Sequence, residues 1–184
     1  MEDEIEFIID SAREAMQNAI VHLEKQLVNI RAGKASPAML GSVRVDYYGA
    51  QTPLNQVANV NTPDARTLSI QPFEKSLIPA IEKGIMLANL GFNPMNNGES
   101  VIINVPPLTE ERRKELAKQA KAEAEEAKIG VRNDRKNANQ EIRRLDISED
   151  EKKSAEADVQ KLTDSYVEKI DKILAVKEKE IMTV

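Results

Sequence analysis

Apolar residues recur at three- and four-residue steps through three long segments of the chain, which is the spacing of one face of an α-helix. The segments span residues 3–32, Thr109–Leu145 and 148–182. Their stripes comprise Ile5, Ile8, Ile9, Ala12, Met16, Ala19, Leu23, Leu27 and Ile30; Leu116, Ala120, Ala124, Ala127, Val131, Ala138, Ile142 and Leu145; and Ala155, Val159, Leu162, Tyr166, Ile170 and Ile173. Because no single helix can bury such a stripe, the pattern predicts an antiparallel three-helix bundle.

Local signals mark where these helices begin and end. Gly33 can adopt the left-handed backbone that stops the first helix. Thr109 is placed to cap the second helix, and Ser148 with Glu151 has the spacing of a capping box for the third. The residues Asp146 to Ser148 then form the tight turn between the second and third helices.

Between the first two helices the apolar period shortens to that of strands. Strands are predicted at 43–47, 56–60, 67–71 and 101–105, a helix at 77–90, and turns at 48–50 and 62–64. The sequence therefore predicts an α+β protein of two domains. A small α/β domain, residues 31–106, is inserted into a bundle formed by residues 1–30 and 107–184.

Two short connections would join these domains, and few short connections favour a hinge over a rigid interface. The predicted hinge consists of Arg31, Ala32, Gly33 and Lys34 on one connection and Val105, Pro106 and Pro107 on the other. The prolines restrict the backbone of the second connection, so bending should concentrate on the first. We expect an elongated, bent molecule.

Composition points to a cytoplasmic protein without a membrane span. The chain has 41% hydrophobic residues and no cysteine, and no long apolar run interrupts its charged residues. Met1 is followed by acidic residues instead of a basic segment and an apolar run, so we expect no secretory signal. We also expect a monomer.

The net charge of −5 is unevenly distributed. Residues 107–145 hold 11 basic and 8 acidic groups, whereas residues 146–184 hold 7 and 11. Within the second helix, Lys121, Lys128, Arg132 and Arg135 line a second face, with Lys118 and Arg143 near its ends, although Asp134 interrupts the run. This face either keeps an exposed helix soluble or binds something acidic, and screening allows such a patch on an acidic protein.

Little in the sequence supports catalysis. The chain has one histidine, no cysteine, no glycine-rich phosphate loop and no metal-ligand spacing, so we predict no catalytic residue, metal or cofactor and no binding of GTP by the chain alone. RNA, which is read largely through phosphate and 2′-hydroxyl contacts, suits a basic face. The alternative is a helical scaffold or chaperone-like adaptor, in which the bundle binds proteins and these charges only keep the helix soluble.

Five separated motifs carry a family resemblance. They are Ile30 to Pro37 (IRAGKASP), Tyr47 to Gly49 (YYG), Pro106 to Lys114 (PPLTEERRK), Val131 to Asn133 (VRN) and Asp158 to Asp164 (DVQKLTD). In order and spacing, over the whole chain, they resemble the bacterial ribosome recycling factor family.

The resemblance implies an L-shaped, tRNA-sized protein that binds the ribosome after termination. With elongation factor G, whose GTP hydrolysis supplies the energy, such a protein separates the ribosomal subunits. The bundle is then expected to contact rRNA of the large subunit. Arg132 and Arg135 match the family's principal RNA-contacting arginines, and Arg31 matches another residue of a family motif. At Lys136 the chain departs from the arginine that the family often has, and lysine lacks the planar fork of arginine.

Overall fold

The computed structural model describes residues 2–30 and 33–183. The chain divides into two compact units. One, here called the sheet unit, comprises residues 33–108, and the other, the helical unit, comprises the residues before and after it.

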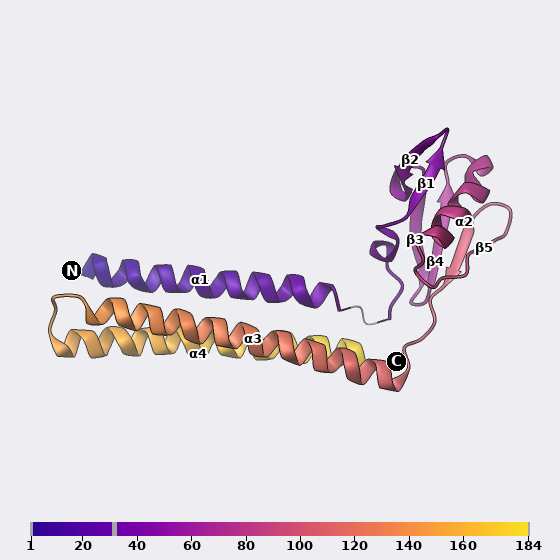
Figure 1. The fold of residues 1–184 in the computed structure, drawn as a ribbon. Helices are drawn as coiled ribbons and strands as arrows, with labels where there is room; N and C mark the ends of the chain where they lie inside the picture. The colour runs from indigo at the N-terminus through magenta and orange to yellow at the C-terminus, as the bar shows by residue number, and fades with distance from the viewer. Residues whose placement is uncertain (1, 31–32, 184) are drawn as a thin grey trace. The chain divides into compact units, whose positions relative to one another are not determined.

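The helical unit is built from α1 (Glu2–Val28), α3 (Glu110–Arg143) and α4 (Glu149–Met182). All three pairs of helices are in contact. Figure 1 shows them lying side by side along their lengths, with α3 running opposite to both α1 and α4. The predicted antiparallel three-helix bundle is confirmed.

The buried faces of these helices follow the predicted stripes closely. On α3 the buried residues are Leu116, Ala120, Ala124, Val131, Ala138 and Ile142. On α1 they are Ile8, Ala12, Met16, Ile20, Leu23 and Leu27. On α4 they are Ala155, Val159, Thr163, Tyr166, Ile170 and Ile181. The stripes missed Ile20, Ile181 and Thr163, whose hydroxyl is satisfied by the Val159 carbonyl at 2.8 Å.

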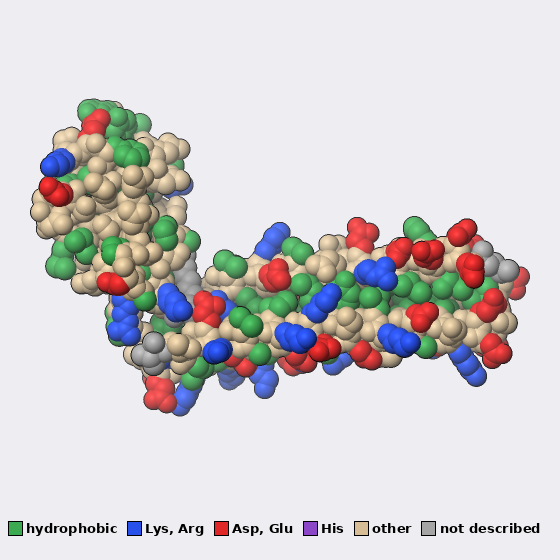
Figure 2. All heavy atoms as spheres, turned by 180° about the vertical axis from the view of Figure 1, so that it is seen from behind, with side chains coloured by type: hydrophobic (Ala, Val, Ile, Leu, Met, Phe, Trp, Pro, Cys, Tyr) green, Lys and Arg blue, Asp and Glu red, His purple; other side chains and the backbone are tan. Residues whose placement is uncertain are grey.

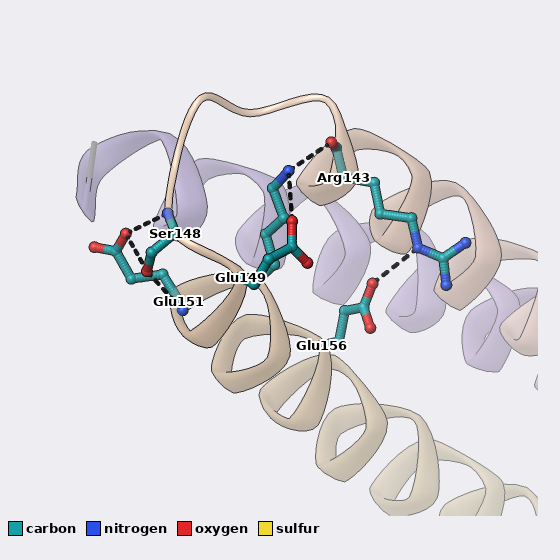
Figure 3. Close-up of polar contacts among 6 residues, drawn as sticks. Arg143, Ser148, Glu149, Glu151 and Glu156 are labelled. Atoms are coloured by element: carbon teal, nitrogen blue, oxygen red, sulfur yellow. Dashed lines mark hydrogen bonds and ion pairs between the residues drawn. The ribbon is translucent and has the colours of Figure 1, made fainter.

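The predicted caps of α3 and α4 are confirmed. The Thr109 hydroxyl accepts from the Arg112 N–H at 3.1 Å. At α4 the Ser148 hydroxyl accepts from the Glu151 N–H, and the Glu151 carboxylate accepts from the Ser148 N–H at 2.9 Å, as Figure 3 shows. These bonds favour the carboxylate form and lower the pKa of Glu151. The first helix ends at Val28, earlier than predicted, because the next residues turn back to carbonyls three positions before them.

The sheet unit contains two antiparallel sheets (Figure 1). In the first, β1 (Arg44–Tyr47) pairs with β2 (Ala50–Pro53). The second has the order β3-β4-β6-β5, formed by β3 (Ala58–Asp64), β4 (Thr67–Pro72), β6 (Val101–Asn104) and β5 (Met95–Asn96). The helix α2 (Ile78–Leu87) packs against β1.

Short helical turns at Pro37–Leu40, Leu54–Gln56 and Lys75–Leu77 complete this unit, and the Ser36 hydroxyl caps the first by accepting from the Ala38 N–H. The buried core of the unit is aliphatic, with Val43, Val45, Leu68, Ile70, Ile81 and Ile103 fully enclosed.

Three details of the sheet unit differ from the prediction. The segment 62–64 is the irregular end of β3 and not a turn. The reversal follows directly after this segment, at Ala65 and Arg66, because the Asp64 carboxylate accepts from the Arg66 N–H at 2.8 Å and from the Thr67 hydroxyl at 2.9 Å. The strands β2 and β5 were not predicted, since both are short, contain no buried residue and lack apolar alternation. The helix predicted over 77–90 is also shorter, ending at Leu87.

Two glycines test how tightly each unit is packed. A Cβ on Gly84 of α2 would lie 2.4 Å from the Arg44 carbonyl oxygen, whereas a Cβ on Gly130 of α3 would meet nothing within 4 Å. Gly84→Ala should therefore force α2 away from β1 and cost about 1–3 kcal/mol of sheet-unit stability. Gly130→Ala should stabilise the helical unit by about 0.5–1 kcal/mol.

Amide hydrogen exchange reports on each unit separately. Exchange should become faster at β4 and β6 in Gly84→Ala and slower along α3 in Gly130→Ala. Wild-type exchange at β4 in Gly84→Ala would show that α2 and β1 can separate at no cost.

Candidate nucleic-acid interface

The middle and end of α3 carry an open depression formed by this helix alone. Its lining residues are Ile129, Arg132, Asn133, Arg135, Lys136, Asn139, Gln140 and Arg143. Four of the eight are basic, three are amides, and none is acidic. We call this surface the basic depression. On the face of the helical unit that Figure 2 shows, acidic and basic side chains are mixed, so the separation of charge in the basic depression is local.

The sequence places this surface by breaking the apolar stripe of α3. Between the buried residues Val131 and Ala138, the positions that would continue the stripe hold Asp134 and Arg135, both half-buried. Because adjacent positions of a helix point in different directions, Arg135 lies on the side of α4 and Asp134 on the side of α1. Arg135 donates to the Gln160 amide oxygen of α4 at 3.2 Å.

Asp134 turns the other way. It lines a separate depression between α1 and α3, together with Ile8, Ser11 and Ala12. Burial among these residues raises the pKa of Asp134. Although Asp134 stands next to Arg135 in the sequence, it is not among the residues that line the basic depression.

Lys128 is already paired within the helical unit. Its ammonium lies 2.5 Å from Asp171 of α4 and 3.6 Å from Glu125, and its side chain is only 14% exposed. The hydrogen bond to Asp171 raises the pKa of Lys128. Of the basic residues predicted from sequence, Lys128 therefore has the least charge left for an external partner.

Arg132, Lys118 and Lys121 are exposed on the same helix. Over residues 2–30 and 33–183, no carboxylate lies within ion-pair distance of any of the three. Their charges are available to solvent or a ligand. Arg31, the remaining predicted contact, lies outside the described residues, as does Ala32 of the predicted hinge.

Sequence reasoning missed the amides of this surface. Asn133, Asn139 and Gln140 carry no charge, so a search for basic spacing passes over them. The signal that could have found them is helical periodicity, because Arg132, Lys136, Asn139 and Arg143 follow one another at steps of four, three and four. The resulting surface offers guanidinium, ammonium and amide N–H donors, the groups that contact phosphate and sugar oxygens.

The described residues contain neither the pattern of a metal site nor that of a membrane span. Among them, no group of three or more His, Cys, Asp or Glu side chains is arranged to hold a metal ion. No helix in the described part of the chain combines the length and apolar character needed to cross a membrane. The basic, amide-rich depression on one helix of the bundle has the charge to attract an anionic partner.

Comparison with known proteins identifies the family. The model of the ribosome recycling factor family matches residues 23–182. The ribosome-recycling factor of Christiangramia forsetii is 78% identical over 99% of this chain and 100% of its own length. That of Bacillus licheniformis is 50% identical over 96% and 98%. The chain therefore belongs to the ribosome recycling factor family, a family of translation factors without enzymatic activity of their own.

Solved structures agree with this assignment. A solution structure of the ribosome recycling factor, 40% identical, covers 98% of both chains with a TM-score of 0.71. A second match is to models of the T. thermophilus ribosome recycling factor and the E. coli elongation factor G bound to the E. coli post-termination complex. It has 43% identity and a TM-score of 0.60, and it covers 97% of this chain and 99% of the other.

The pairing of Lys128 predicts a role in stability. Lys128→Met should lower the free energy of unfolding of the helical unit at pH 7 by under about 1 kcal/mol, because Asp171 is 54% exposed and water screens the pair. The folded-state pKa of Lys128 is raised above its ordinary value of 10.5, so its contribution is complete below that pH. The difference between variant and wild type should then shrink as pH rises through the folded-state pKa.

Urea unfolding at pH 7 and above pH 10.5 measures this difference. Asp171→Asn is the matched control, and the double variant should lose no more than either single variant. A stability difference that persists unchanged at high pH would assign the effect to packing of the lysine stem instead of its charge.

Proposed function

We propose that this chain recycles ribosomes by binding large-subunit rRNA through the basic depression of α3. One observation carries the proposal: four cations and three amides line one surface, and among the described residues only one of these four cations, Arg143, pairs with a carboxylate, that of Glu156. RNA helices are recognised mainly through phosphate and 2′-hydroxyl oxygens, which accept from these donors. The direct contacts are assigned to Arg132 and Arg135, and Lys118 and Lys121 extend the same face towards the start of α3.

Lys128 and Arg31 have different places in this proposal. Lys128 adds to the positive potential along α3. It makes no direct RNA contact in this proposal because its ammonium is already paired with Asp171. Arg31 is assigned an RNA contact by its match to a family motif.

Elongation factor G is the proposed partner in subunit separation. A structural relative belongs to models that hold a recycling factor and elongation factor G on one post-termination complex, which supports this partner. The sequence has no phosphate-binding loop, so GTP hydrolysis by elongation factor G is the proposed source of energy. The chain acts as a monomer, without a cofactor, in the cytoplasm where ribosomes are found.

The rRNA contacts can be tested by binding to post-termination ribosomes across a salt series. Arg132→Ala and Arg135→Ala should each cost about 1–3 kcal/mol of binding, as for a charge-assisted hydrogen bond. Each should also flatten the slope of log affinity against log salt by somewhat under one unit, because one fewer counterion is released. Arg→Lys at either position should restore the slope but not all the affinity.

Lys172 provides the control for this series. It is 75% exposed on α4 and pairs with Glu168 at 3.2 Å, so Lys172→Ala should bind like wild type. Wild-type affinity of both arginine variants at every salt concentration would mean that the basic depression is only a solvated surface.

We further propose that the two connections between the units act as a hinge during subunit separation. The Ala35 N–H donates to the Ala65 carbonyl at 2.8 Å, and the Val105 N–H donates to the Arg66 carbonyl at 2.7 Å. Both connections are thus anchored to one turn of the sheet unit. Bending is assigned to the residues beyond these anchors: Arg31 to Lys34 on one side, and Pro106 and Pro107, which follow Val105, on the other.

Gly33 is the position within this hinge that a variant can test. Its φ is +78°, and a Cβ there would lie 2.7 Å from Leu108 Cγ. Gly33→Ala should therefore shift the two connections apart while leaving both folded units intact. Subunit separation with elongation factor G and GTP should fall several-fold, and affinity for the ribosome should change much less.

Gly49→Ala is the matched control. Gly49 also has a positive φ, of +85°, but a Cβ there meets nothing within 4 Å. This variant bears the same backbone strain without the collision, so its rate of subunit separation should stay near wild type. If Gly33→Ala lost ribosome affinity and subunit separation to the same extent, Gly33 would only support the fold and would not act in a hinge.

A further inference from the structure

Three basic side chains of α3 contact acceptors on α4, and these acceptors differ in charge. Lys128 pairs with Asp171 at 2.5 Å, and Arg143 pairs with Glu156 at 3.0 Å (Figure 3). Arg135 instead donates to the amide oxygen of Gln160, at 3.2 Å. Two of the three cations are thus held by a carboxylate, and the third is held by a neutral acceptor.

Gln160 is itself oriented by a second hydrogen bond. Its amide nitrogen donates to the Asp164 carboxylate, one turn further along α4, at 2.8 Å. An amide presents one donating and one accepting end. Because Asp164 engages the donating end, the accepting oxygen is left facing Arg135.

Arg135 has a particular need for such support. It contacts α4, is half-buried as a residue, and lines the basic depression. A free arginine side chain samples many rotamers, and ordering it on binding costs entropy. A hydrogen bond to a neutral acceptor lowers that cost. It uses one of five N–H donors and leaves the charge uncancelled.

We propose that Gln160, oriented by Asp164, is a positioning residue that holds Arg135 ready for an RNA phosphate without neutralising it. This inference rests on the proposed function, in which Arg135 contacts rRNA. A carboxylate at position 160 would hold the guanidinium at least as firmly but would cancel the field that attracts phosphate. An amide acceptor at this position therefore holds the Arg135 guanidinium without cancelling its positive charge.

Two substitutions at position 160 separate these effects. Gln160→Met keeps the length of the side chain but removes the acceptor, so ribosome affinity should fall about three- to tenfold, the factor that corresponds to ordering one long side chain. The slope of log affinity against log salt should stay at its wild-type value, because Arg135 keeps its charge. Gln160→Glu keeps an acceptor but adds a negative charge, so affinity should fall and the slope should flatten towards that of Arg135→Ala.

A double-variant cycle tests whether Gln160 acts through Arg135. In the Arg135→Ala background, Gln160→Met should cause no further loss of affinity. Gln119→Met is the matched control, since Gln119 is exposed on α3 and the helical repeat puts it on nearly the opposite face from Arg135. This variant should bind like wild type, and urea unfolding checks that all variants are folded.

The outcomes distinguish this inference from the proposed function. Wild-type affinity of Arg135→Ala alone would overturn this inference, and wild-type affinity of Arg132→Ala as well would overturn the proposed function. Weak binding by Arg135→Ala, with wild-type behaviour of Gln160→Met and Gln160→Glu, would overturn the positioning role alone. The same would follow if Gln160→Met weakened binding equally with and without Arg135, because Gln160 would then act independently.

Discussion

The helical unit depends on a single constraint: one stripe of α3 must pack against two other helices. Small residues such as Ala120, Ala124 and Ala138 allow this close approach, and all three are buried. The stripe is interrupted once, where Asp134 and Arg135 stand between Val131 and Ala138. A break in an otherwise consistent pattern is where function is expected to override packing. Here it places an arginine at the interface between α3 and α4 and opens a surface without carboxylates.

The acidic balance of the whole chain and its basic surface are compatible because the charges of α4 are placed selectively. Two carboxylates of α4, Asp171 and Glu156, pair with Lys128 and Arg143 of α3. The residue of α4 that contacts Arg135, between them, is an amide. Net charge therefore says little about which surface meets an anion. The identity of the acceptor on the neighbouring helix decides which cations remain available.

Much of the fold could be predicted from the sequence because its signals are local. The three helices follow from a 3.6-residue repeat, and the caps at Thr109 and Ser148 follow from hydrogen bonds that span three residues. The strand β2 and the exact turn after β3 could not be predicted, since the pairing of β1 and the carboxylate of Asp64 decide them. Arg132 could be placed on the exposed face by spacing alone. The pairing of Lys128, the direction of Asp134 and the amide beside Arg135 depend on neighbouring helices, which spacing on α3 does not reveal.

The two ends of the sheet unit lie close together, as the contact distance between Gly33 and Leu108 and the shared anchoring turn require. Closing a long flexible loop costs chain entropy that grows with its length, but a folded insert counts only by the gap between its ends. Once residues 33–108 have folded, α1 and α3 are joined as if by a few residues. The chain entropy lost when α1 pairs with α3 is then small, although the two helices are far apart in sequence. This favours a folding order in which the sheet unit forms before the bundle closes.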